Sequence, residues 1–117
     1  MRTILLVDDS HRIRPLVRAI LADLDCQILE ADGADQALEL AADPETRIDL
    51  LLTDITMPGM SGVELAARLR LSFPNVQVLY MSGYALPSLI TKEMHFIEKP
   101  FRPDALLAKV REMFERG

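Results

Sequence analysis

The sequence contains a single cysteine, Cys26, and no long apolar segment. One thiol excludes an internal disulfide and fits a reducing compartment, so we expect a cytoplasmic protein. The longest apolar runs, such as residues 4–7, have four residues, which is too few to cross a membrane. Only five residues separate Arg2 from Asp8, fewer than the apolar core of a secretory signal peptide needs. We therefore expect no association with a membrane.

Basic residues are also scarce: 13 Lys and Arg stand against 18 Asp and Glu, giving a net charge of −5. A net acidic chain is a poor candidate for direct binding to nucleic acid, whose phosphates attract basic surfaces. The sequence shows no linker, internal repeat or low-complexity stretch. Its 117 residues are enough for one domain with its own core and too few for two. We expect a single globular domain over residues 1–117.

Short apolar runs alternate with amphipathic stretches along the chain. Five runs predict buried strands, at residues 3–7, 27–31, 48–53, 76–81 and a short one around 96–97. Amphipathic stretches predict helices that begin near residues 10, 33, 62 and 103, the last of them ending near residue 115. This alternation predicts an α/β fold, a parallel sheet with helices on both faces.

The first predicted helix follows Ser10, whose hydroxyl is expected to cap it. Its apolar positions, Leu16 among them, recur at helical spacing. Pro15 lies inside this helix and is expected to remove one hydrogen bond and to kink the helix near its first turn. Arg14 and Arg18 are expected on the solvated face.

Residues capable of chemistry follow four of the five predicted strands. Asp8 and Asp9 follow the first, Asp54 the third, Ser82 the fourth and Lys99 the fifth. Ligands bind to parallel α/β sheets at the carboxyl ends of the strands, so these residues are expected at one edge of the sheet. Glycine-rich phosphate loops are not an alternative, because neither GxGxxG nor GxxxxGK[ST] occurs in the sequence.

Three neighbouring carboxylates repel one another unless a proton or a cation compensates their charge. Hard oxygen ligands suit Mg²⁺, which prefers octahedral oxygen coordination and usually keeps several waters. Lys99 would add a second positive charge and Ser82 a hydroxyl donor. The set predicts a phosphoryl-transfer site in which one aspartate attacks phosphorus.

Each of these residues also has an ordinary structural explanation. Asp8, Asp9 and Ser10 are typical helix-capping residues, a serine before glycine is common in turns, and most lysines are solvated. Asp54 on its own is compatible with a loop carboxylate. Their common position at one edge of one sheet is what favours the functional interpretation.

Four segments carry a resemblance to a known family: ILLVDDS at residues 4–10, LLTDITMP at 51–58, MSGY at 81–84 and FIEKPF at 96–101. In order and spacing they resemble the receiver domain of two-component response regulators. The residues at 81–84 and 96–101 are similar to those in the receivers of hybrid histidine kinases. The resemblance implies a flavodoxin-like, five-stranded parallel sheet of order 2-1-3-4-5.

The resemblance also implies a role for each site residue. Asp54 would accept a phosphoryl group from a histidine of a partner kinase or phosphotransfer protein. Asp9, Asp54 and the backbone carbonyl of Thr56 would bind Mg²⁺, with Asp8 acting largely through water. Lys99 would pair with the phosphoryl oxygens. Such a domain is only marginally an enzyme, since it catalyses its own phosphorylation and dephosphorylation.

Further positions would form the switch. Ser82 would turn to hydrogen-bond a phosphoryl oxygen, and Phe96 would move inward as it does so. The bond before Pro100 would be a cis peptide. Thr56 and Tyr84 would tune how long the phosphoryl group lasts.

The stretch from Ser82 to Lys99 is short for the family, at 17 positions. Residues 85–93 leave room for about two helical turns, so the fourth helix of the family is predicted to be short, irregular or absent. The chain is either a domain of a larger hybrid kinase or a free single-domain regulator.

Other functions remain open alternatives. The first is a receiver fold that binds its partner without being phosphorylated, although such domains usually lack one of the five site residues. A flavin-binding protein of similar topology is disfavoured because two carboxylates follow the first strand, where FMN phosphate would bind. A phosphatase with an aspartate nucleophile is disfavoured because Thr56 interrupts the Asp-x-Asp pattern that begins at Asp54.

Overall fold

The computed structural model describes residues 1–83 and 94–116 of the chain. Its elements, in chain order, are β1 (Arg2–Val7), α1 (Ile13–Ile20), the 3-10 turn η1 (Leu21–Asp23), β2 (Cys26–Ala31), α2 (Ala34–Ala42), β3 (Leu50–Asp54), α3 (Gly62–Ser72), β4 (Gln77–Ser82), β5 (His95–Glu98) and α4 (Pro103–Arg116). Strands and helices alternate as the sequence predicts. The predicted short fourth helix and the role of Tyr84 fall in residues 84–93, outside the described residues.

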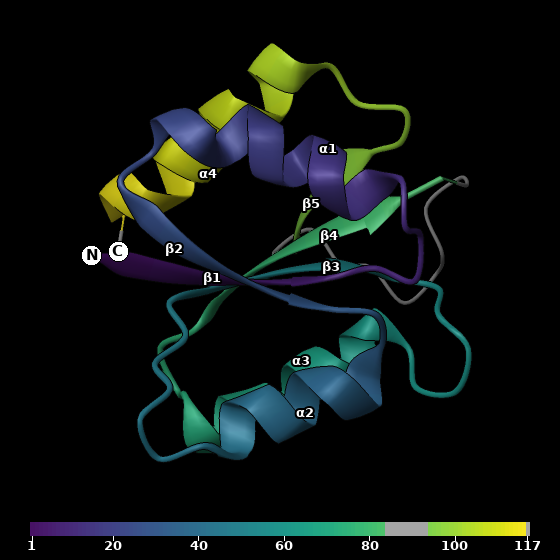
Figure 1. Cartoon of the computed structure of the whole chain (residues 1–117), viewed down its shortest axis with the longest axis vertical. Helices are drawn as coiled ribbons and strands as arrows, with labels where there is room; N and C mark the ends of the chain where they lie inside the picture. The colour runs from purple at the N-terminus through teal and green to yellow at the C-terminus, as the bar shows by residue number, and fades with distance from the viewer. Residues whose placement is uncertain (84–93, 117) are drawn as a thin grey trace.

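The five strands form one parallel sheet in the order β2-β1-β3-β4-β5, which confirms the predicted topology (Figure 1). β1 lies between β2 and β3, with Val7 opposite both Ala31 and Thr53. All strands therefore end at the same edge. Asp8, which follows β1, and Asp54, which closes β3, become neighbours for this reason.

Helices cover both faces of the sheet, α1 and α4 on one side and α2 and α3 on the other (Figure 1). Successive strand residues point to opposite faces, so β1 contributes to two cores. Leu5 and Val7 pack toward α2 and α3, whereas Ile4 and Leu6 pack toward α1 and α4. The central strands are buried on both sides, which explains their uninterrupted apolar sequence.

The start of α1 differs from the prediction. The helix begins at Ile13, and Ser10 acts upstream of it, where its Oγ accepts hydrogen bonds from the backbone N–H groups of Arg12 and Ile13 at 3.2 and 3.3 Å. Pro15 consequently lies in the first turn. Because the first four N–H groups of a helix have no partner within it, Pro15 removes no hydrogen bond from α1, and the predicted loss of one was wrong.

No helix among residues 1–83 and 94–116 is long and apolar enough to cross a membrane.

Candidate functional site

The carboxyl ends of four strands bring together the five residues singled out in the sequence. Asp8 is fully buried after β1, and Asp54 closes β3 as a largely buried carboxylate. Ser82 closes β4 and is nearly buried, and its backbone carbonyl accepts a hydrogen bond from Lys99 N at 2.6 Å. That bond carries Lys99, the first residue after β5, to the same edge.

Lys99 joins two of the carboxylates. Its Nζ donates to Asp8 Oδ2 at 2.8 Å and to Asp54 Oδ2 at 3.3 Å, and its side chain is only 18% exposed. The other oxygen of Asp8, Oδ1, accepts the backbone N–H of Ser10 at 2.8 Å. The peptide bond between Lys99 and Pro100 is cis, as the resemblance implies. A mostly buried ammonium thus occupies the space between two strands.

Burial and charge shift the acid–base properties of this pair. Burial raises the pKa of Asp54 above its usual value, and the nearby Asp8 carboxylate adds to the rise, while Lys99 and the backbone N–H of Thr56 oppose it. For Lys99, burial alone would lower the pKa, but hydrogen bonding and the charge of Asp8, together with Asp54, outweigh it and raise the pKa. Lys99 therefore remains charged at neutral pH.

Three carboxylates of the site fit a hard divalent cation. Asp8, Asp9 and Asp54 each offer an oxygen, and these oxygens lie within 4.8 Å of one another. Asp9 is exposed, which leaves the group open to water on one side. An all-oxygen set with an open side matches the preference of Mg²⁺ for carboxylate ligands and retained waters. The residues present therefore fit the predicted cation.

A cavity of about 340 Å³ opens directly over this edge of the sheet. It is lined by Asp54, Thr56, Gly83 and Lys99, so the carboxylate and the ammonium face the same open space. Phe96, predicted to be the aromatic switch, lies on β5 opposite Tyr80 of β4 and packs partly buried against the α2–α3 core. It is not among the described residues that line the cavity over Asp54.

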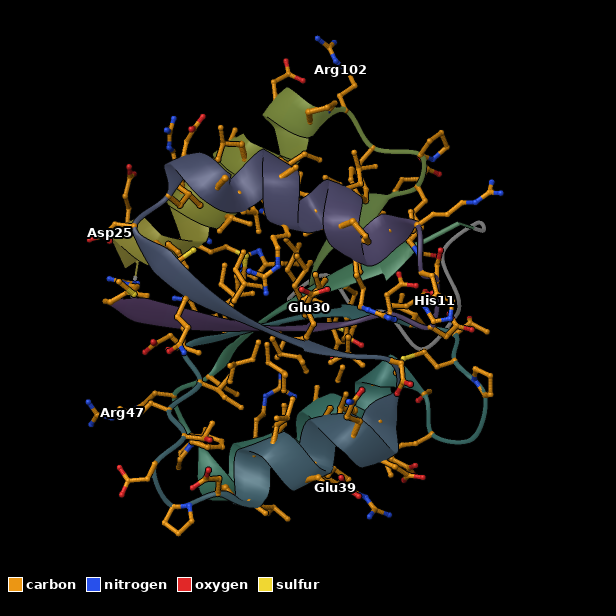
Figure 2. All side chains as sticks on the ribbon, viewed as in Figure 1. His11, Asp25, Glu30, Glu39, Arg47 and Arg102 are labelled. Atoms are coloured by element: carbon orange, nitrogen blue, oxygen red, sulfur yellow. The ribbon has the colours of Figure 1, made fainter. Side chains whose placement is uncertain are left out.

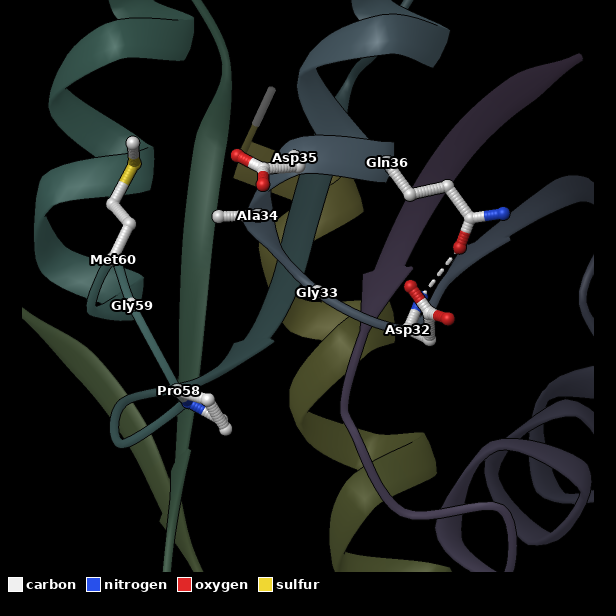
Figure 3. Close-up of a pocket in the computed structure, with 8 residues that line it drawn as sticks. All are labelled: Asp32, Gly33, Ala34, Asp35, Gln36, Pro58, Gly59 and Met60. Carbon is white, nitrogen blue, oxygen red and sulfur yellow. Dashed lines mark hydrogen bonds between the residues drawn. The ribbon is translucent and has the colours of Figure 1, made fainter.

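A second, smaller cavity of about 180 Å³ lies beside the site, between the loop that follows β2 and the loop that follows β3 (Figure 3). Asp32, Asp35, Pro58 and Met60 are among the residues that line it, and the backbone N–H of Asp32 donates to Gln36 Oε1 at 2.7 Å. None of the five predicted site residues lines this cavity. We therefore do not assign it to the phosphoryl site.

Sequence reasoning missed the role of Gly62, near which it predicted only the start of a helix. Gly62 opens α3, and a Cβ atom built on it would lie 2.2 Å from the backbone carbonyl oxygen of Asp54. Its N–H donates to the carbonyl of Ile55 at 2.8 Å. The helix thus approaches the strand end more closely than any side chain would allow, and this fixes the backbone of Asp54.

Sequence reasoning also placed Arg14 wrongly. Its side chain is only 15% exposed, and its Nη1 donates to the backbone carbonyl of Asp8 at 2.5 Å. Arg18 does reach the solvent as predicted, at 51% exposed. Spacing alone does not separate the two, because both lie on the side of α1 that faces β2.

The sequence pattern of the response regulator receiver domain matches residues 4–111 of this chain. The chain belongs to the receiver domain family. It is similar to proteins that differ widely in length. Sporulation initiation phosphotransferase F of Bacillus subtilis is 33% identical over 115 residues, which are 93% of this chain and 90% of that protein.

Another relative is a much longer protein. The sensor kinase CckA of Brucella abortus is 29% identical over 97% of this chain, but the match spans only 13% of the kinase. Among solved structures, the receiver domain from the hybrid histidine kinase CckA superimposes with a TM-score of 0.81 at 29% identity, covering 95% of this chain and 97% of the other. The receiver fold thus occurs among its relatives both nearly alone and as a small part of a long chain.

Proposed function

We propose that this receiver domain is a Mg²⁺-dependent phosphoacceptor that takes a phosphoryl group from a phosphohistidine onto Asp54 and changes conformation in response. The observation that carries the proposal is the position of the Asp54 carboxylate. Its Oδ2 lies 3.3 Å from the Lys99 ammonium, its carboxylate forms a group with those of Asp8 and Asp9 whose oxygens lie within 4.8 Å of one another, and it lines an open cavity. We assign residues 1–117 to this one domain.

Asp54 would act as the nucleophile. A carboxylate oxygen attacks phosphorus, the new P–O bond forms, the P–N bond to the donor histidine breaks, and its electron pair stays on the imidazole nitrogen. Attack needs the ionised carboxylate. Lys99 favours that form although burial opposes it, because its ammonium lies 3.3 Å from Asp54 Oδ2.

Asp8, Asp9, Asp54 and the backbone carbonyl of Thr56 would hold the cation. When bound, Mg²⁺ would neutralise part of the charge on the carboxylates and on the incoming phosphoryl oxygens. Lys99 would exchange its contact with Asp54 for one with a phosphoryl oxygen while it keeps its shorter contact with Asp8. The positively charged ammonium of Lys99 is thereby in place before the donor arrives.

Ser82 and Phe96 would carry the response. A new dianionic group beside Lys99 favours the conformation in which the Ser82 hydroxyl also contacts it. Ser82 lies opposite Glu98 in the sheet, and Phe96 lies two residues earlier on the same strand as Glu98. A movement at Ser82 would therefore reach Phe96 along the β4–β5 pair.

The donor would be a histidine kinase or a histidine phosphotransfer protein in the cytoplasm. It would be either a separate protein or another part of the same hybrid kinase chain. An apolar groove of about 350 Å³ adjoins the site, lined by Ile13, Leu16, Lys99, Pro100 and Phe101 with Gly83. Leu16 is 48% exposed, although it recurs at helical spacing with the other apolar residues of α1. An exposed leucine next to the acceptor suits an apolar surface of the donor protein.

Phosphotransfer with Mg²⁺ and acetyl phosphate tests the proposal on the wild type and on Asp54→Asn. We expect the mass of one added phosphoryl group, or radiolabel from a labelled donor, on the wild type alone. Equal labelling of both proteins would exclude Asp54 as the acceptor. If neither protein is labelled although Mg²⁺ binds, the alternative of a phosphorylation-independent interaction module replaces the proposal.

A further inference from the structure

Arg14 stands out among the charged residues outside the proposed phosphoryl site, because it is largely buried and contacts the backbone of a site residue. Its Nη1 donates to the carbonyl oxygen of Asp8 at 2.5 Å, and its Nη2 lies 3.3 Å from Nδ1 of the exposed His11. A guanidinium has five donors in a rigid plane, so it can hold several acceptors at once.

Glu30 of β2 supports this guanidinium from the other side. Its Oε1 lies 3.7 Å from Arg14 Nε, and its Oε2 accepts a hydrogen bond from Arg18 Nε at 2.6 Å. Figure 2 shows Glu30 on β2, beneath α1. Arg18 also donates to the carbonyl of Ile28 at 3.0 Å. Two arginines one helical turn apart thus tie α1 to β2, but only Arg14 reaches the site.

The contact with Arg14 completes the fixing of Asp8. The N–H of Asp8 donates to the carbonyl of Ala31 at 3.2 Å, Oδ1 accepts from Ser10 N, and Oδ2 accepts from Lys99. The remaining polar atom is the backbone carbonyl, and Arg14 binds it. This carbonyl belongs to the peptide unit that joins Asp8 to Asp9, so its orientation sets where the Asp9 carboxylate begins.

We propose that Arg14 is a positioning residue that orients the Asp8–Asp9 peptide through its hydrogen bond to the Asp8 carbonyl and thereby sets the Mg²⁺ affinity of the site. The inference rests on the proposed function for its metal. Partners that orient metal ligands typically change metal affinity by about 10–100-fold when they are removed. We expect Arg14→Gln to bind Mg²⁺ about tenfold more weakly than the wild type.

The sign of the effect separates positioning from simple charge. A cation near three carboxylates repels a second cation, so loss of charge alone would make Arg14→Gln bind Mg²⁺ more tightly. Positioning predicts weaker binding. Arg18→Gln is the matched control, since it removes an arginine that also pairs with Glu30 but does not contact Asp8.

The experiment measures Mg²⁺ affinity by calorimetric titration of the wild type, Arg14→Gln and Arg18→Gln, with urea unfolding to verify that each is folded. About tenfold weaker binding by Arg14→Gln, with Arg18→Gln within twofold of the wild type, supports the proposal. Equal or tighter binding by Arg14→Gln overturns it. Equal weakening in both variants also overturns it, because the loss would then follow Glu30 pairing and not the Asp8 contact.

A second measurement needs no metal. The Ser10 N–H donates to the Asp8 carboxylate. With all metal removed by a chelator, amide hydrogen exchange at Ser10 is expected to be several-fold faster in Arg14→Gln than in Arg18→Gln. Equal exchange in the two variants overturns the positioning role. If the wild type binds no Mg²⁺, the proposed function fails, whereas the exchange rates still decide whether Arg14 orients Asp8.

Discussion

Replacing Gly62 by alanine should move the proposed phosphoacceptor without touching any ionisable group. The added Cβ would lie 2.2 Å from the carbonyl oxygen of Asp54 and 3.1 Å from Thr53 Cγ2. A carbon and a carbonyl oxygen in contact are normally about 3.3 Å apart, so α3 and the end of β3 must separate by about 1 Å. Both partners are backbone or buried, and neither can rotate away.

The magnitude follows from the cost of such crowding. Inserting one carbon into a well-packed region typically costs about 1–3 kcal/mol. The better helix propensity of alanine recovers little, because Gly62 is only the first residue of α3. Unfolding entropy for 117 residues is about 0.25 kcal/mol per degree, so the expected fall in Tm is about 4–12 °C. A shift of Asp54 by this distance should also weaken Mg²⁺ binding about tenfold.

Thermal unfolding followed by circular dichroism, with Mg²⁺ titration below the transition, checks both effects. Gly33→Ser is the matched control, since Gly33 precedes α2 with nothing within 4 Å of its Cβ position and serine is a favourable residue before a helix. The control should stay within about 0.5 kcal/mol of the wild type. If Gly62→Ala matched the control in both Tm and Mg²⁺ affinity, α3 would not constrain Asp54.

Two further predictions concern the site and its groove. The pKa of Asp54 is raised in the folded chain, so its protonated form stabilises the fold below the ordinary pKa of an aspartate, and this contribution is lost as pH rises through the raised, folded-state pKa. In a chelator, and hence free of metal, Asp54→Asn should therefore match the wild type in urea unfolding at acid pH and be the more stable of the two at neutral pH. A less stable variant at neutral pH would contradict the direction of the pKa shift. With an autophosphorylated histidine kinase that labels the wild type, Leu16→Ser should accept the phosphoryl group about tenfold more slowly, which is the loss typical of a central interface side chain. Labelling by acetyl phosphate should be unchanged, and equal slowing with both donors would argue against docking at the groove.

The order of the strands was implied by the resemblance to receiver domains. The parallel sheet and the gathering of Asp8, Asp54, Ser82 and Lys99 at one edge could be predicted from the sequence itself. Both depend on local patterns, since apolar runs predict buried strands and a parallel sheet brings their ends together. The exact strand bounds differ by one or two residues. Asp54 and Ser82, for example, close their strands instead of following them.

What could not be predicted depends on contacts between elements. Helical spacing places Leu16 on an apolar stripe, but the side chain is 48% exposed and lines the groove beside Pro100. The role of Arg14 depends on how α1 lies over the end of β1, and that of Gly62 on a close backbone approach. Neither leaves a signal in a single sequence, because an arginine on a helix and a glycine in a loop are ordinary there.

The ion pair between Asp8 and Lys99 joins residues 91 positions apart in the chain. Closing a chain segment of this length costs conformational entropy, so we expect the contact to form late in folding. A chain in which β5 has not yet docked holds Asp8 without its cation and has no complete site to offer a ligand. Stabilisation gained only after the folding barrier slows unfolding and leaves the folding rate nearly unchanged. A filled site would therefore prolong the lifetime of each native molecule without hastening its formation.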